Sequence, residues 1–86
     1  MCWGVYIIQS VPTGHLYTGV TNDPDRRVHE HNHCCKGAKR TRAGRPWNLV
    51  YWEPCSSTVE ALKREYQIKR LTRMQKLRLI DRRRET

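Results

Sequence analysis

The sequence predicts an α/β (α+β) fold, in which a small three-stranded sheet is flanked by about three helices. Three short runs are rich in β-branched and aromatic residues, which is the pattern of strands. Three other stretches begin with residues that cap helices. The chain of 86 residues is long enough for one small domain, which we expect to span 1–86.

The first two strands are predicted at residues 3–9 and 15–20, with a turn at 10–14 between them. Pro12 fixes φ and Gly14 tolerates a positive φ, so this segment has the composition of a hairpin turn. Side chains alternate along a strand, and therefore Tyr6 and Tyr17 could share one face of the sheet. The hairpin register decides whether they do, and the sequence leaves it open.

A first helix is predicted at residues 24–33, because Asp23 suits the cap position and Pro24 the first helical position. Arg27 and His31 lie four residues apart and share a face of this helix. Val28 is the one strongly apolar residue of the segment. A cation and an imidazole projected together from such a helix indicate work at a surface or cleft rather than packing.

A basic loop follows at residues 36–46, with nothing apolar larger than alanine. Its charges are suited to contact phosphates, although a charge run can also be a merely solvated loop. The candidate nucleic-acid-binding residues of this loop are Lys36, Lys39, Arg40, Arg42 and Arg45.

The third strand and two further helices complete the predicted domain. Residues 47–52 form an apolar run typical of a strand buried on both faces. Capping-box patterns at residues 57–60 and 72–75 predict two helix starts. The apolar stripe of the last helix is expected at Met74, Leu77 and Ile80, and the basic tail at 82–86 is expected to fray.

Glu65 is the most informative acid of the second half. It falls within the predicted apolar stripe of its helix, which runs through Ala61, Leu62 and Ile68. A carboxylate on a buried helix face costs several kcal/mol unless it is paired, protonated or bound to a metal. The two alternatives for Glu65 are therefore a metal ligand and a salt bridge with a neighbouring arginine.

Charge and cysteine content narrow the class of protein. Lys and Arg number 17 against 8 acids, for a net charge of +9, which indicates a polyanionic partner with nucleic acid first. No apolar run is long enough for a membrane span, so we expect a cytoplasmic protein without a membrane partner. Four cysteines lack disulfide-framework or C-x-x-C spacing and are expected to be reduced thiols: Cys2, Cys34, Cys35 and Cys55.

A cluster of zinc-capable side chains lies at residues 29–35. His29 and His33 could share a helix face, and Cys34 and Cys35 follow directly. No second ligand pair stands at zinc-finger spacing, so structural zinc ranks behind the other interpretations.

The ordered set Gly4-Val5-Tyr6, Tyr17-Thr18-Gly19, Arg27, His31 and Glu65 resembles the GIY-YIG nuclease superfamily, and most of all its small stand-alone single-domain branch. The resemblance covers nearly the whole chain, with valine and threonine each standing where the family has isoleucine. Homing members place an asparagine downstream of the metal-binding glutamate, whereas the asparagines here are at 22, 32 and 48.

This resemblance implies a three-stranded antiparallel sheet and a metal-dependent endonuclease that hydrolyses phosphodiester bonds. By resemblance Tyr6 activates the attacking water, directly or through metal-bound hydroxide, and Tyr17 supports that water or the scissile phosphate. Arg27 would neutralise phosphate charge, and His31 would assist proton transfer or bind phosphate. Glu65 would hold Mg²⁺ or Mn²⁺, and a single carboxylate with waters and substrate oxygens suits Mg²⁺.

The implied partner is DNA, including structured or branched DNA in repair or recombination. Larger members carry a separate DNA-binding or second catalytic domain, and we expect none here, so targeting is expected to come from the basic surface or from a protein partner. The alternative is a non-catalytic nucleic-acid-binding module on the same fold.

Overall fold

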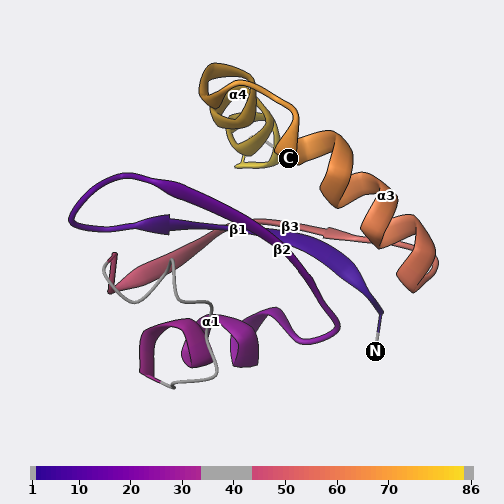
Figure 1. Cartoon of the computed structure of the whole chain (residues 1–86), viewed down its shortest axis with the longest axis horizontal. Coiled ribbons are helices and arrows are strands. Elements are labelled where there is room, and N and C mark those ends of the chain that lie inside the picture. The colour runs from indigo at the N-terminus through magenta and orange to yellow at the C-terminus, as the bar shows by residue number, and fades with distance from the viewer. Residues whose placement is uncertain (1, 34–43, 85–86) are drawn as a thin grey trace.

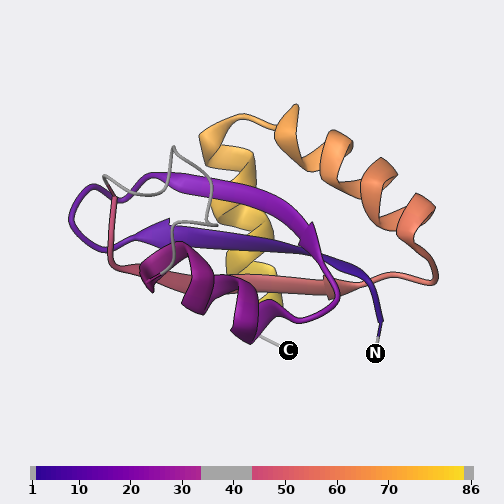
Figure 2. The same ribbon diagram turned by 60° about the horizontal axis from the view of Figure 1, so that its bottom comes forward.

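The fold is a three-stranded antiparallel sheet with helices on both faces (Figures 1 and 2). The computed structural model describes residues 2–33 and 44–84. The sheet has the strand order β2-β1-β3, and helix α1 lies against one face while α3 and α4 lie against the other. The predicted fold class is confirmed. The elements are β1 (Gly4–Ser10), β2 (Leu16–Thr21), α1 (Pro24–His33), β3 (Trp47–Pro54), α3 (Thr58–Lys69) and α4 (Arg73–Arg84).

The hairpin between β1 and β2 forms as predicted and fixes the register. Gly14 adopts φ 77°, which its missing side chain permits, and its N–H donates to the Ser10 carbonyl at 2.8 Å. Tyr6 is paired with Gly19, and Tyr17 with Ile8. Because Tyr6 and Ile8 are two residues apart, Tyr6 and Tyr17 project from the same face of the sheet.

Each helix start is capped by the residue that the sequence indicated. Asp23, Ser57 and Thr72 each accept a hydrogen bond from the backbone N–H three residues later, at 3.1, 3.2 and 3.2 Å. At Thr72 the capping box is complete, since Gln75 Oε1 accepts in return from the Thr72 N–H at 2.9 Å. These caps explain why α1 begins at Pro24 and therefore where its functional side chains point.

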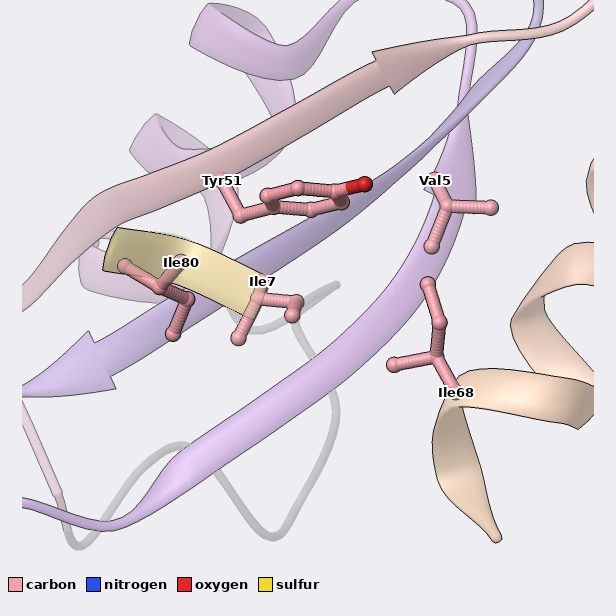
Figure 3. Close-up of a cluster of buried hydrophobic side chains, with 5 residues drawn as sticks. All are labelled: Val5, Ile7, Tyr51, Ile68 and Ile80. Atoms are coloured by element: carbon pink, nitrogen blue, oxygen red, sulfur yellow. The ribbon is translucent and has the colours of Figure 1, made fainter. Parts of the chain in front are cut away.

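The larger apolar core lies between the sheet and the helices α3 and α4. Val5, Ile7 and Tyr51 project from the strands toward Ile68 and Ile80 on the two helices (Figure 3). The α1 face holds a second cluster, built on Tyr6, Ile8 and Trp47. Strand β1 is thus buried on both faces, and it is the rigid element from which the Tyr6 side chain projects.

The third strand differs from the prediction of a strand buried on both faces. Trp47 and Tyr51 are buried, but Asn48 between them is exposed. The reason is topological, because β3 lies at an edge of the sheet and β1 is the central strand.

The predicted helical stripes are only partly correct. Leu62 is 51% exposed and Met74 is 63% exposed, whereas Ala61, Ile68 and Ile80 are buried. Helix α3 meets the sheet along a narrow line, and Leu62 is turned about 100° away from Ala61 because a helix has 3.6 residues per turn. Helix α4 remains helical to Arg84, which includes part of the tail expected to fray.

Two further features bear on the class of protein. Cys2 and Cys55 are free cysteines, while Cys34 and Cys35 lie outside the described residues. Within the described parts of the chain, no helix has the length and apolar character that crossing a membrane requires.

The narrow contact line of α3 leads to a stability prediction. Ile68→Ala should lower the free energy of unfolding by about 2–5 kcal/mol, because the side chain is fully buried. Leu62→Ala is the matched control and should cost about 0.5 kcal/mol or less, since Leu62 projects to solvent. Chemical denaturation of both variants measures the difference, and similar losses would contradict this packing.

Candidate active site

Tyr6 is the centre of the candidate site. It projects from the middle of β1 toward α1 and is 1% exposed. Its ring lies across Gly19 of the neighbouring strand: a β-carbon added there would come within 2.5 Å of the Tyr6 hydroxyl oxygen and 2.6 Å of the ring carbon Cζ. Only glycine therefore fits at position 19 while the Tyr6 ring holds this place.

The Tyr6 hydroxyl meets the imidazole of His31. Tyr6 Oη and His31 Nε2 are 2.8 Å apart, and both side chains are buried. The Tyr17 ring lies beside them, with centroid distances of 5.1 Å to His31 and 6.4 Å to Tyr6. The structure thus brings together three predicted site residues from β1, β2 and α1.

Arg27 lies one helical turn before His31 and supplies positive charge to the same place. Its guanidinium is close enough to the Tyr6 hydroxyl to favour the phenolate form. It also pairs with Glu30 at 3.3 Å between Nη1 and Oε1, and both side chains are partly exposed. Glu30 was not among the predicted site residues, although its position three residues after Arg27 is a recognisable pairing signal.

The ionisation of the pair is set by burial and by charge. Burial raises the pKa of Tyr6 to about 12, against the opposing effect of Arg27. Burial and then the Arg27 charge lower the pKa of His31 to about 4. At neutral pH the phenol is therefore protonated and the imidazole neutral. In the tautomer whose Nδ1 carries the proton, the phenol donates its hydrogen bond to Nε2 of His31.

Glu65 is partly buried on α3, three residues before Ile68. Burial is the largest influence on the pKa of Tyr6, and the charge of Glu65 is the smallest of those that raise it. The ion-pair partner of Glu65 is Lys69, with 3.5 Å between Nζ and Oε2, rather than the arginine considered from the sequence. The Glu65 side chain is 21% exposed in this pair, so part of its carboxylate can be reached from solvent.

A metal ion at this site would need ligands from water and substrate in addition to Glu65. Among the residues that the structure describes, no three His, Cys, Asp or Glu side chains are grouped to hold a metal by themselves. The His29 and His33 rings do share a helix face, with centroids 4.6 Å apart, but Cys34 and Cys35 lie outside the described residues. One carboxylate, waters and substrate oxygens fit Mg²⁺, which retains much of its hydration.

The far end of α1 is fixed to β3 by side-chain contacts. Asn32 makes two hydrogen bonds to the Trp47 backbone, accepting from its N–H at 2.7 Å and donating to its carbonyl at 3.0 Å. Arg45 Nε donates to the His31 carbonyl at 2.5 Å. Arg45, predicted to contact nucleic acid, thus also supports the helix that carries His31. The other predicted loop residues lie outside the described residues: Lys36, Lys39, Arg40 and Arg42.

Comparison with known proteins defines the class. Residues 2–78 match the family described as the GIY-YIG catalytic domain, and the chain belongs to this family.

Its relatives are UPF0213 proteins. One from Desulfotalea psychrophila is 50% identical over 78 residues, covering 91% of this chain and 70% of that protein. One from Staphylococcus aureus is 51% identical over 79 residues, covering 92% and 94%. The solution NMR structure of a UPF0213 protein from Bacillus halodurans is 41% identical and superimposes with a TM-score of 0.58, covering 94% of this chain and 84% of that one.

The lowered pKa of His31 predicts a pH dependence of stability. Between about pH 6.5 and 4 the unfolded chain binds a proton at His31 that the folded chain does not, so the free energy of unfolding falls as pH falls. The loss approaches about 3 kcal/mol at the lower limit.

This dependence should flatten in His31→Gln, even though that variant is less stable overall. His29→Gln, on the exposed side of the same helix, is the control and should keep the wild-type slope. Denaturation between pH 4 and 7 measures both slopes. Equal slopes in the two variants would show that the pKa of His31 is the same in the folded and the unfolded chain.

Proposed function

We propose that this protein is a metal-dependent endonuclease that hydrolyses phosphodiester bonds in DNA. The observation that carries the proposal is the buried hydrogen bond between Tyr6 and His31, with the Arg27 guanidinium beside the same hydroxyl. A purely structural tyrosine would need a partner for its hydroxyl but not an adjacent cation that favours its ionised form.

The pair supports a proton relay for the attacking water. Tyr6 would take a proton from the water while its own proton passes to Nε2 of His31. Burial lowers the pKa of His31 and keeps the imidazole neutral in the free protein, so Nε2 carries a lone pair but is a weak base there. The negative charge of a bound phosphate would raise the pKa of His31 and so favour this transfer when substrate is present.

Arg27 and Tyr17 would act on the phosphate rather than on the water. The Arg27 guanidinium is partly exposed, so it could reach substrate while its charge still acts on the Tyr6 hydroxyl. Charge that develops on the phosphate in the transition state would be stabilised by this fixed cation. Tyr17 packs edge-on against His31 and would place its hydroxyl at the scissile phosphate or the water.

Glu65 is the residue that would hold Mg²⁺ or Mn²⁺. Members of the GIY-YIG family typically depend on a metal. The metal, when bound, polarises the phosphate and lowers the pKa of a coordinated water. Burial is the main cause of the raised pKa of Tyr6, and the charge of Glu65 adds a weaker influence, which supports placing both groups within electrostatic reach of one phosphodiester. A cation beside Tyr6 would also offset the burial that raises the pKa of its phenol.

The substrate is proposed to be DNA, with branched and flapped forms first, because the net charge of +9 favours a polyanion and places no demand on base sequence. Targeting by a protein partner is part of the same proposal. The alternative is a non-catalytic role, in which the protein binds these substrates and cuts none of them.

Glu65→Gln should abolish Mg²⁺-dependent cleavage, because the amide keeps the size of the side chain but removes the charge that attracts the metal. The matched control is Glu60→Gln on the same helix. It also breaks an ion pair within α3, between Glu60 and Lys63 at 3.9 Å, and should cut at the wild-type rate.

Both variants should keep the wild-type melting temperature within a few degrees, because both broken ion pairs are largely exposed on the lysine side. Cleavage of branched, flapped and single-stranded DNA is measured with and without Mg²⁺. A Glu65→Gln protein that cuts with unchanged metal dependence would remove Glu65 from the metal site. A wild-type protein that binds these substrates and cuts none would favour the binding module.

A further inference from the structure

A hollow lined by basic side chains lies on the sheet face opposite α1. This hollow of about 280 Å³ is lined by His15, Leu16, Arg73 and Lys76. These residues come from the end of the hairpin turn, the start of β2 and the first turn of α4. Figure 2 shows the first turn of α4 beside β2, and Figure 1 shows α4 on the opposite side of the sheet from α1.

The arginine and the lysine of this hollow differ from several other cations of the protein in having no carboxylate partner among the described residues. Arg27, Arg64, Lys63 and Lys69 all form ion pairs with carboxylates. Neither Arg73 nor Lys76 forms an ion pair with any residue in the described parts of the chain, and the lining contains no acid. Their charge is therefore available to a ligand.

One side of the hollow is the hairpin turn, and Arg73 of the other side lies over it. Arg73 reaches back over the turn, so that a β-carbon added at Gly14 would lie 3.6 Å from its Nη2 atom. The turn itself is fixed by a hydrogen bond from the Ser10 N–H to the His15 carbonyl at 2.9 Å and one from Gln9 Nε2 to the Gly14 carbonyl at 3.3 Å. The hydrogen-bonded turn gives the basic side chains of this hollow a fixed neighbour, which a charged loop in solvent does not have.

The position of the hollow relates it to the candidate active site. Strand β2 is an edge strand, and it carries Leu16 toward the hollow and Tyr17 toward His31. Adjacent residues of a strand project to opposite faces. A nucleic-acid strand that passes over the edge at β2 would therefore meet both places.

We propose that His15, Arg73 and Lys76 form a phosphate-binding site that holds the DNA backbone where it crosses β2. This inference rests on the proposed function and adds a contact that fixes the substrate strand away from the cleaved bond. The hollow of about 280 Å³ has room for a phosphate group. The free phosphate ion has the same chemistry, and the experiment distinguishes it.

The test compares two double variants that remove the same charge from α4. Arg73→Gln with Lys76→Gln alters the hollow, while Arg78→Gln with Arg82→Gln removes two arginines elsewhere on that helix. Glutamine has a helix propensity close to those of lysine and arginine, so both proteins should fold, and melting temperatures verify this. Binding of fluorescein-labelled branched DNA is measured in EDTA across a series of salt concentrations.

The hollow variant should bind about 10- to 50-fold more weakly than wild type at moderate salt, and its salt slope should fall by about 0.7–0.9, the value for one lost phosphate contact. The control variant should show a clearly smaller change in both. Equal losses would mean that only net charge matters, and an unchanged affinity would mean no contact, so either result would overturn the site.

Inorganic phosphate provides the second arm. At matched ionic strength phosphate should displace DNA from the wild-type protein better than chloride does, and it should lose this advantage in the hollow variant. Saturable phosphate binding that the hollow variant loses, together with unchanged DNA affinity in that variant, would assign the hollow to the free ion instead. Because binding is measured without metal, the result is independent of cleavage. If the hollow variant binds DNA more weakly than the control variant but the wild-type protein never cuts, this site is supported and the nuclease is rejected. If the wild-type protein cuts but the two variants bind DNA equally well, only this site is rejected.

Discussion

The structure depends on one constraint, which is that a buried phenol must have a hydrogen-bond partner. An unpaired hydroxyl in the position of Tyr6 would cost about 1–3 kcal/mol, and His31 removes this cost at 2.8 Å. The contact requires α1 to be held against the sheet, and the Asn32 hydrogen bonds to the Trp47 backbone hold it there. It also requires room for the ring, which Gly19 provides. The same geometry that satisfies the core therefore presents a tyrosine, a neutral imidazole and a guanidinium together.

Burial gives the pair one protonation state over a wide pH range. It raises the pKa of Tyr6 to about 12 and lowers that of His31 to about 4, so neither group titrates near neutrality in the free protein. Bound phosphate and a cation would bring both values toward neutrality, because the phosphate favours the imidazolium and the cation favours the phenolate. In the proposed nuclease, substrate and metal would thereby activate the relay, and the free protein would remain inactive.

Local signals in the sequence predicted most of the elements, since capping residues, the Pro12 and Gly14 turn and alternating apolar residues act over a few positions. Contacts between elements could not be predicted in this way. The exposure of Leu62 and the edge position of β3 depend on how the helices and strands pack. The sequence likewise left the tyrosine register open, and it contained no sign that Arg73 would reach the turn at Gly14. The candidate residues themselves came from the order of the motif, and the structure adds the contacts between Tyr6, His31 and Arg27.

The central claim is that the Tyr6 hydroxyl takes part in hydrolysis, and single-turnover cleavage of branched DNA by Tyr6→Phe tests it most directly. Tyr51→Phe is the matched control, because Tyr51 is also a buried strand tyrosine whose pKa is raised to about 12, but its hydroxyl donates to Glu53 on the opposite side of the sheet. Tyr6→Phe should cut about 100-fold more slowly or worse with Mg²⁺ present, while Tyr51→Phe should retain its rate. Cleavage by Tyr6→Phe at the wild-type rate would contradict the account.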